Sequence, residues 1–125
     1  MIAADTSTWI AFLRDEPGAD CEQLDRALAN NAVAMPPVVL AELFSRIGVA
    51  QEAVRVLEAV PVLEILPGYW RRAGELRARV LALGRRARLG DALIAQSCLD
   101  HGMDLITRDS DFRAFAAAGG LKLGE

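Results

Sequence analysis

Short apolar runs alternate along the chain with longer segments in which an apolar residue recurs at every third or fourth position. The short runs end at turn residues or prolines and are typical of buried strands, whereas the longer spacing is typical of helices. The short runs predict strands at residues 2–4, 32–35, 61–67, 104–107 and 121–123. The helical spacing predicts helices at residues 8–13, 21–28, 37–47, 49–60, 69–83, 91–101 and 112–116.

This order of elements indicates the fold class. Strands that alternate with helices are joined through right-handed crossovers and therefore pair in parallel. A chain of 125 residues has the length of one domain, and no repeat or linker divides it. We therefore expect a single domain over residues 1–125, with a three-layer α/β/α fold and a central, mainly parallel sheet of about five strands.

The composition is that of a compact protein, since hydrophobic residues make up 53% of the chain. No apolar run reaches the roughly 18 residues that a membrane span needs, and the N-terminus lacks the basic and apolar regions of a secretion signal. The two cysteines, Cys21 and Cys98, do not have CxxC spacing. We therefore expect a cytoplasmic protein with reduced, structural thiols.

Acidic residues recur where predicted strands end or the next helices begin. Asp5 follows the first strand, and Glu42 and Asp91 lie near the starts of two helices. Asp109 and Asp111 follow the fourth strand. Because ligands collect outside the carboxyl ends of parallel strands, these side chains are expected to converge at one edge of the sheet.

A divalent cation would relieve the repulsion between carboxylates packed at such an edge. Mg²⁺ prefers oxygen ligands, and Mn²⁺ accepts the same donors. A cation held in this way can activate water and neutralise phosphate charge, which suits hydrolysis of a phosphodiester. No His/Cys cluster indicates zinc, since His101 is the only histidine.

Each carboxylate also has an ordinary structural explanation. Ser7 or Thr8 is expected to cap the first helix, and Asp5 is an alternative cap. Glu42 can be a solvated helix residue, and Asp91 is favoured at a helix start by the helix dipole. The last two aspartates can be turn and cap residues. The coincidence of all of them is what favours a shared site.

Four motifs carry a resemblance to a known family. They are Asp5-Thr-Ser-Thr-Trp-Ile, Val39-Leu-Ala-Glu42-Leu, Gly90-Asp91-Ala-Leu-Ile-Ala95 and Leu105-Ile-Thr-Arg-Asp109-Ser-Asp111-Phe112. In this order and at this chain length they resemble the successive motifs of PIN domains, and more narrowly those of the VapC-type ribonuclease toxins of bacterial toxin–antitoxin pairs. Each motif alone is weak, but the set covers essentially the whole chain.

The resemblance implies a Mg²⁺- or Mn²⁺-dependent endoribonuclease that cuts RNA to leave a 5′-phosphate and a 3′-hydroxyl. It also implies a cognate antitoxin that holds the enzyme inactive. Carried over by position, the acidic quartet is Asp5, Glu42, Asp91 and Asp109. Asp5 and Asp91 would be the principal metal ligands, directly or through water. Glu42 and Asp109 would complete the shell, hold a second ion or orient the attacking water.

The resemblance also assigns supporting residues. Ser7 matches the small hydroxyl residue beside the first aspartate, and Thr107 matches the hydroxyl before the last one. Family members differ in which acidic residue of the final Asp-x-Asp-Phe stretch faces the metal. Asp109 is the expected third metal ligand here, with Asp111 as the alternative.

Positive charge is concentrated in one part of an acidic chain. The formal net charge is −3, yet half of the 14 basic residues lie between Arg71 and Arg88. Within that segment Arg85, Arg86 and Arg88 have no acidic neighbour before Asp91. We expect these three to contact RNA phosphates, or an acidic antitoxin segment that occupies the same place. The ordinary alternative is a solvated surface.

An exposed apolar face is expected on the helix predicted at residues 37–47. Ile47 belongs to its core face. Val38, Val39 and Phe44 are expected to remain exposed. Exposed apolar patches mark interfaces, and a symmetric homodimer is the commonest outcome. The family resemblance also implies a homodimer.

Two other functions use the same kind of fold. A catalytically silent PIN-like module that only binds RNA or protein is the first alternative, and the intact acidic quartet argues against it. A phosphoacceptor signalling domain also places aspartates and Mg²⁺ at strand ends, but it needs an acidic pair after the first strand and a lysine near the site. Asp5 stands alone there, and Lys122 is the only lysine.

Overall fold

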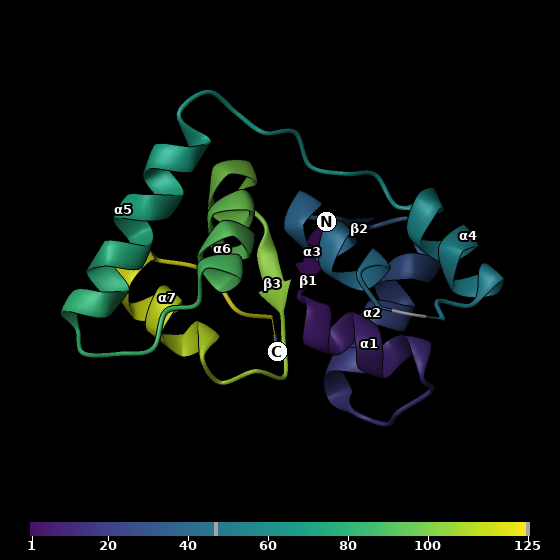
Figure 1. Cartoon of the computed structure of the whole chain (residues 1–125). Helices are drawn as coiled ribbons and strands as arrows, with labels where there is room; N and C mark the ends of the chain where they lie inside the picture. Colours follow the sequence, from purple (N-terminus) through teal and green to yellow (C-terminus); the bar gives the residue numbers. More distant parts are fainter. Residues whose placement is uncertain (47, 125) are drawn as a thin grey trace.

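The computed structural model describes residues 1–46 and 48–124, and folds them into three strands and seven helices (Figure 1). The strands are β1 (Ile2–Ala4), β2 (Val33–Ala34) and β3 (Asp104–Ile106). The helices are α1 (Thr6–Leu13), α2 (Ala19–Ala29), α3 (Pro37–Phe44), α4 (Gln51–Ala59), α5 (Tyr69–Ala82), α6 (Leu89–His101) and α7 (Phe112–Gly119). Ile47, expected on the core face of the third helix, lies outside the described residues.

β1 is the central strand of a parallel sheet with the order β2-β1-β3. Ala3 pairs with Ala34 on one side and with Leu105 on the other. Helices separate the paired strands in the sequence, as parallel pairing requires. The predicted α/β fold with a parallel sheet is therefore confirmed.

The segments predicted as strands at residues 61–67 and 121–123 join this sheet through one residue pair each. Val62 pairs with Met35 at one edge of the sheet, and Leu123 pairs with Leu105 at the other edge. Both pairs are parallel. The prolines that flank the first segment lack the N–H that a ladder needs, and Val62 is 49% exposed. In the described residues the sheet therefore has three strands and a single bridge at each edge, instead of five full strands.

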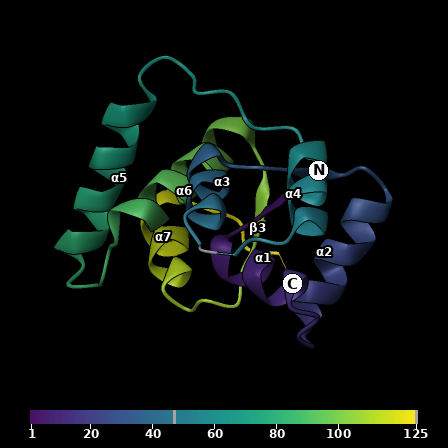
Figure 2. The ribbon, with the colours of Figure 1, turned by 45° about the vertical axis from the view of Figure 1, so that its right-hand side comes forward.

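Helices lie on both sides of the sheet, as Figures 1 and 2 show. On one side α5, α6 and α7 contact one another. On the other side α1 contacts both α2 and α3. A contact between α3 and α6 joins the two groups. This contact matters for the site, because α3 carries Glu42 and α6 carries Asp91.

The core combines small strand residues with large helical side chains. Ala3 and Ala4 of β1 are completely buried, and their small side chains leave room for the layers on both faces of the sheet. The bulk is supplied mainly by helices; the largest fully buried side chains include Trp9, Leu24, Tyr69, Leu76, Ile94, Phe112 and Phe115. A core packed on both faces fixes the strand ends from which the candidate site is built.

The first helix begins earlier than predicted. Asp5, not Ser7 or Thr8, is the N-cap of α1, and its carboxylate accepts a hydrogen bond of 3.1 Å from the backbone N–H of Thr8. The reason is that Asp5 still has the extended backbone of the strand, which an N-cap requires. In the same way α6 begins at Leu89, so Asp91 lies in its first turn and does not open it.

The expected apolar face of α3 is smaller than predicted. Val39 is completely buried, because α3 packs between α1 and α6. Its assignment to an exposed face is therefore wrong. Phe44 is 43% exposed, as expected, and Val38 is partly buried.

Cys21 and Cys98 are buried free thiols, and burial raises the pKa of Cys98 to about 12. A buried thiol with a raised pKa is unreactive, so Cys98 fills space in the core. None of the helices in residues 1–46 and 48–124 combines the length and the apolar character that a membrane span requires.

Candidate metal centre

The parallel sheet brings separate parts of the chain to its carboxyl edge. Asp5 comes directly after β1, and residues 107–111 come directly after the neighbouring strand β3. Glu42 lies on α3, beyond β2, and Asp91 lies in the first turn of α6. The strand ends and helix starts therefore meet at the edge where open α/β sheets collect ligands.

Asp5 is the most deeply buried of the predicted carboxylates, with 3% of its surface exposed. The Ser7 hydroxyl donates to it, 2.9 Å from Oδ1 and 2.8 Å from Oδ2, and Oδ1 also accepts the cap hydrogen bond from Thr8. Burial raises the pKa of Asp5, and hydrogen bonds from Ser7, Thr8 and Thr107 oppose that shift. Asp5 therefore caps α1 and also lies at the edge of the sheet where the candidate site is built.

Glu42 is exposed, but its direction is fixed. The hydroxyl of Thr6 donates to Glu42 Oε1 at 2.6 Å. The other oxygen, Oε2, lies 3.6 Å from the position of a Cβ atom built on Gly90, which is the residue before Asp91. Glu42 therefore faces the first turn of α6.

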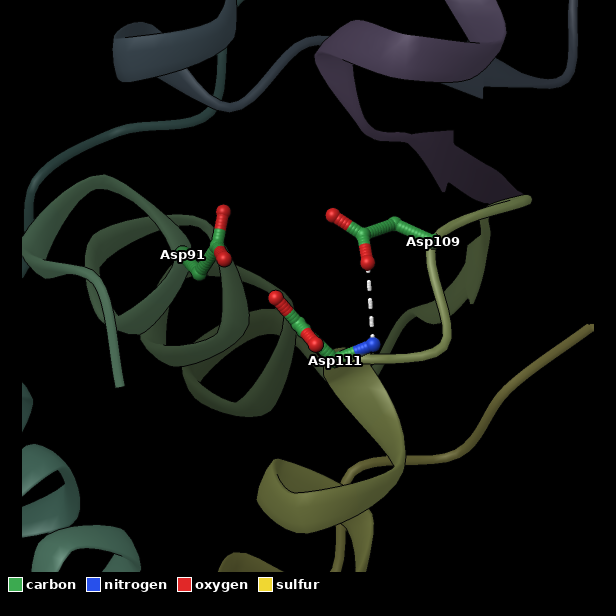
Figure 3. A group of neighbouring side chains, drawn as sticks. All are labelled: Asp91, Asp109 and Asp111. Atoms are coloured by element: carbon green, nitrogen blue, oxygen red, sulfur yellow. Dashed lines mark hydrogen bonds between the residues drawn. The ribbon is translucent and has the colours of Figure 1, made fainter. Parts of the chain in front are cut away.

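Asp91, Asp109 and Asp111 form a tight group. One carboxylate oxygen from each lies within 4.8 Å of the others, and Figure 3 shows the three side chains turned toward a shared space from α6, the β3–α7 loop and the start of α7. Asp109 Oδ1 accepts a hydrogen bond of 2.9 Å from the backbone N–H of Asp111. The Asp109 N–H donates to the Thr107 hydroxyl at 3.0 Å. Thr107, predicted as a supporting residue, thus shapes this loop.

The electrostatics of Asp91 link this group to the other predicted carboxylates. The pKa of Asp91 is raised to about 6, first by burial and then by the charge of Asp109, with further contributions from Asp5 and Glu42. The positive charge of Arg88 opposes the shift. The charges of the other three carboxylates of the predicted quartet therefore all reach Asp91.

These residues fit a divalent cation such as Mg²⁺ or Mn²⁺. Asp91 Oδ2 is buried and has no hydrogen-bond partner among residues 1–46 and 48–124, which is costly for a carboxylate oxygen unless a ligand satisfies it. The surrounding donors are carboxylate oxygens, which hard cations prefer. The tight group differs from the predicted ligand set in one respect: Asp111 belongs to it, whereas Asp5 lies outside it.

One of the predicted basic residues, Arg86, lies beside this group. Arg85, Arg86 and Arg88 are exposed, and Arg86 Nη1 lies 3.9 Å from Asp111 Oδ2. Arg77 Nε donates to the carbonyl oxygen of Ala87 at 2.7 Å and so holds the connector between α5 and α6. The sequence does not reveal the Arg86–Asp111 contact, because the two residues belong to different elements.

Sequence reasoning also missed two residues that orient the carboxylates. Thr6 holds Glu42, and Thr8 donates its backbone N–H to Asp5. A hydroxyl next to a candidate acidic ligand was the signal that could have identified Thr6, whereas the Thr8 contact is the cap hydrogen bond of Asp5 and needs no hydroxyl.

Known proteins resemble this chain in sequence and in fold. The family model described as "PIN domain" matches residues 2–118. A chain of VapBC2 from Rickettsia felis, solved bound to a DNA fragment from its promoter, has a TM-score of 0.75 at 21% identity, covering 99% of this chain and 98% of that chain. A chain of VapBC-1 from nontypeable Haemophilus influenzae has a TM-score of 0.75 at 23% identity, covering 100% and 98%. These two matches show similarity of fold.

A third solved structure has a higher identity. VapBC-5 from Mycobacterium tuberculosis, a member of the VapBC family of toxin–antitoxin systems, has a chain that is 29% identical, with a TM-score of 0.69 and coverage of 98% of this chain and 95% of that chain. Among curated protein sequences no match was found.

Proposed function

Because the chain belongs to the PIN domain family, we propose that it is a metal-dependent endoribonuclease that acts as the toxin of a toxin–antitoxin pair. The observation that carries the proposal is the gathering of Asp91, Asp109 and Asp111 around a buried carboxylate oxygen without a partner, with Asp5 and Glu42 in the same electrostatic field. The similarity to VapBC structures supports the biological role.

We assign the cation to Asp91 and Asp109, together with Asp5 at the end of the central strand and Asp111 at the start of α7. When bound, Mg²⁺ or Mn²⁺ supplies Lewis-acid stabilisation of the charge that develops on a phosphate oxygen. Asp5 contributes rigidity, because its hydrogen bonds to Ser7 and Thr8 leave it one orientation.

Glu42 is the residue we assign to the attacking water. Thr6 holds Oε1, which leaves Oε2 on the side of Gly90 and Asp91 to accept a hydrogen bond from water. A positioned carboxylate in this place can orient the water and take its proton. Cleavage of the RNA backbone then leaves a 5′-phosphate and a 3′-hydroxyl.

Arg85, Arg86 and Arg88 are proposed to bind the RNA phosphates that flank the cut. Their side chains are exposed and precede Asp91 by only a few positions. Arg86 already lies near Asp111, and RNA phosphates would offer it additional anionic partners. Phosphate contacts of this kind position RNA without reading its sequence.

Two grooves beside α4 are available to the proposed antitoxin. One, of about 590 Å³, is lined by apolar residues such as Leu13, Leu43 and Leu57, together with Arg14 and Arg46. The other, of about 580 Å³, lies between α2 and α4 and is bordered by Phe12 of α1 and Val33 of β2. An amphipathic antitoxin helix with acidic residues fits the first groove, since apolar grooves accept helix faces and the arginines attract negative charge.

A cleavage assay tests the proposal. The purified protein should cut RNA with Mg²⁺ or Mn²⁺, and EDTA should stop the reaction. Asp91→Asn protein, confirmed as folded by circular dichroism, should be inactive under the same conditions. If the wild-type protein binds RNA or an antitoxin but never cuts RNA with either cation, it is a catalytically silent PIN module and the proposal fails.

A further inference from the structure

Arg108 precedes Asp109 in the loop after β3, but its side chain is directed to the start of α2. Arg108 Nε donates to Asp20 Oδ2 at 2.8 Å, and Nη2 donates to Asp20 Oδ1 at 2.9 Å. Nη2 also donates to the carbonyl oxygen of Pro17 at 3.3 Å, and Nη1 lies 3.7 Å from a carboxylate oxygen of Glu16. Two parallel charge-assisted bonds of this kind fix direction as well as distance.

Asp20 connects this ion pair to the central strand. Its Oδ2 also accepts a hydrogen bond of 2.9 Å from the hydroxyl of Thr8. The backbone N–H of Thr8 in turn donates to Asp5 Oδ1. Thr8 is completely buried, and the Asp20 side chain is only 12% exposed. A continuous series of bonds therefore runs from Arg108 through Asp20 and Thr8 to Asp5.

The backbone at Gly18 lies directly beside the ion pair and leaves no space for a side chain there. A Cβ atom on Gly18 would lie 2.5 Å from Asp20 Oδ1 and 2.8 Å from Arg108 Nη2. Gly18 also has a φ of +151°, which side chains rarely adopt. The pair is thus packed directly against the turn that opens α2.

We propose that the Arg108–Asp20 pair is a positioning clamp, which fixes the loop carrying Asp109 relative to Asp5 and so prepares the carboxylates for a cation. The two residues act through the backbone and do not touch the cation. The inference rests on the proposed function for the existence of the cation site. Since Asp109 also holds the N–H of Asp111, release of the clamp shifts both carboxylates of the loop.

The direction in which each substitution changes cation affinity distinguishes a positioning role from a purely electrostatic one. If only charge mattered, removal of Arg108's positive charge would strengthen cation binding, and removal of Asp20's negative charge would weaken it. If the pair positions the loop, both changes weaken cation binding. Arg108→Lys keeps the charge but loses the two parallel bonds, because an ammonium group cannot donate as a planar fork.

Titration calorimetry on the folded, metal-free protein measures the Mn²⁺ affinity of the wild type and of each variant. Arg108→Gln and Asp20→Asn should each weaken Mn²⁺ affinity about tenfold, as the loss of residues that orient ligands typically does. Arg108→Lys should weaken it by a smaller factor. Tighter or unchanged binding by Arg108→Gln, or unchanged binding by Arg108→Lys, overturns the clamp.

The Arg72–Asp100 pair provides a matched control. Arg72 Nε and Nη2 donate to the two oxygens of Asp100 at 3.0 and 2.6 Å, with side-chain exposures of 40% and 8%, against 34% and 12% for Arg108 and Asp20. Asp100 lies on α6 about 13 Å along the axis from Asp91. Asp100→Asn should destabilise the protein to a similar degree yet bind Mn²⁺ with wild-type affinity. An equal loss of affinity in this variant would overturn the clamp as well.

A second readout does not need the cation. In the metal-free protein, Asp20→Asn should speed hydrogen exchange of the Asp109 and Asp111 amides, and Asp100→Asn should not. If the wild-type protein binds no Mn²⁺, the proposed metal site fails, and the exchange rates still decide whether the clamp holds the loop. Unchanged exchange in Asp20→Asn counts against the clamp itself.

Discussion

Thr6 and Glu42 are 36 positions apart in the chain, yet the Thr6 hydroxyl donates to Glu42 Oε1 at 2.6 Å. Thr6 is the first residue of α1 and follows Asp5 directly, whereas Glu42 lies on α3. The bond therefore connects an exposed carboxylate with the end of the central strand. It gives a flexible side chain one preferred direction at the edge of the candidate site.

Removal of this bond should reduce catalysis. Thr6→Val keeps the shape of the side chain but removes the donor, and we expect kcat for RNA cleavage to fall about tenfold, the equivalent of one hydrogen bond to a charged group. Glu42→Gln should lower kcat about a hundredfold, because it removes the proposed base. Ser45→Ala, which removes a hydroxyl bonded to the Ala41 carbonyl oxygen on the same helix, is the control. A wild-type rate in Thr6→Val would show that the bond does not orient Glu42.

Asp91 should make the metal-free protein less stable as pH rises. Burial and the neighbouring carboxylates raise its pKa from 3.8 to about 6. The folded protein therefore holds this proton more tightly than the unfolded chain, so stability is lost between about pH 4 and about pH 6. Asp91→Asn removes that loss and should raise the free energy of unfolding at neutral pH by on the order of 1 kcal/mol, after allowance for solvent screening.

Urea unfolding in EDTA at several pH values measures this difference. Comparison of wild type with Asp91→Asn separates Asp91 from Asp20 and Asp100, because arginine partners lower the pKa of those two carboxyls and both remain in the variant. If the stability difference between wild type and Asp91→Asn does not grow as the pH rises from about 4 to about 6, the pKa of Asp91 is not raised in the folded protein.

The basic connector should dominate the salt dependence of RNA binding. In a catalytically inactive Asp91→Asn background, replacement of Arg85 and Arg86 by alanine should flatten the slope of log affinity against log salt by roughly 1 to 1.5 units, since each phosphate contact on a single strand contributes about 0.7. Arg26 and Arg71, both exposed and distant from the connector in the chain, are the control pair. If the slope is unchanged after loss of Arg85 and Arg86, the connector does not bind RNA phosphates and is an ordinary solvated surface.

A homodimer is expected in solution. Phe44 keeps 43% of its surface exposed on α3, and aromatic residues are enriched at protein interfaces. Sedimentation at micromolar concentration should give the mass of two chains, and Phe44→Ser should shift the protein toward one chain. A wild-type mass of one chain under these conditions would contradict the dimer.

The sequence by itself determined the order of strands and helices and the placement of carboxylates at strand ends. Apolar periodicity is local, so it can be recognised without knowledge of the fold. Parallel pairing then brings the carboxyl ends of neighbouring strands together, which explains why Asp5 and Asp109 could be expected to converge. The same local signals cannot tell a full strand from a single bridge, and Val62 and Leu123 form only bridges.

Only the tertiary structure decided how side chains far apart in the chain meet. Arg108 and Asp20 are 88 positions apart, and no local pattern indicates that the arginine beside Asp109 is directed to α2. Val39 is buried on α3, which contacts both α1 and α6, although its own helix offers no sign of those contacts. Such contacts depend on how helices and loops pack in three dimensions, and packing is a property of the whole folded chain rather than of any one segment.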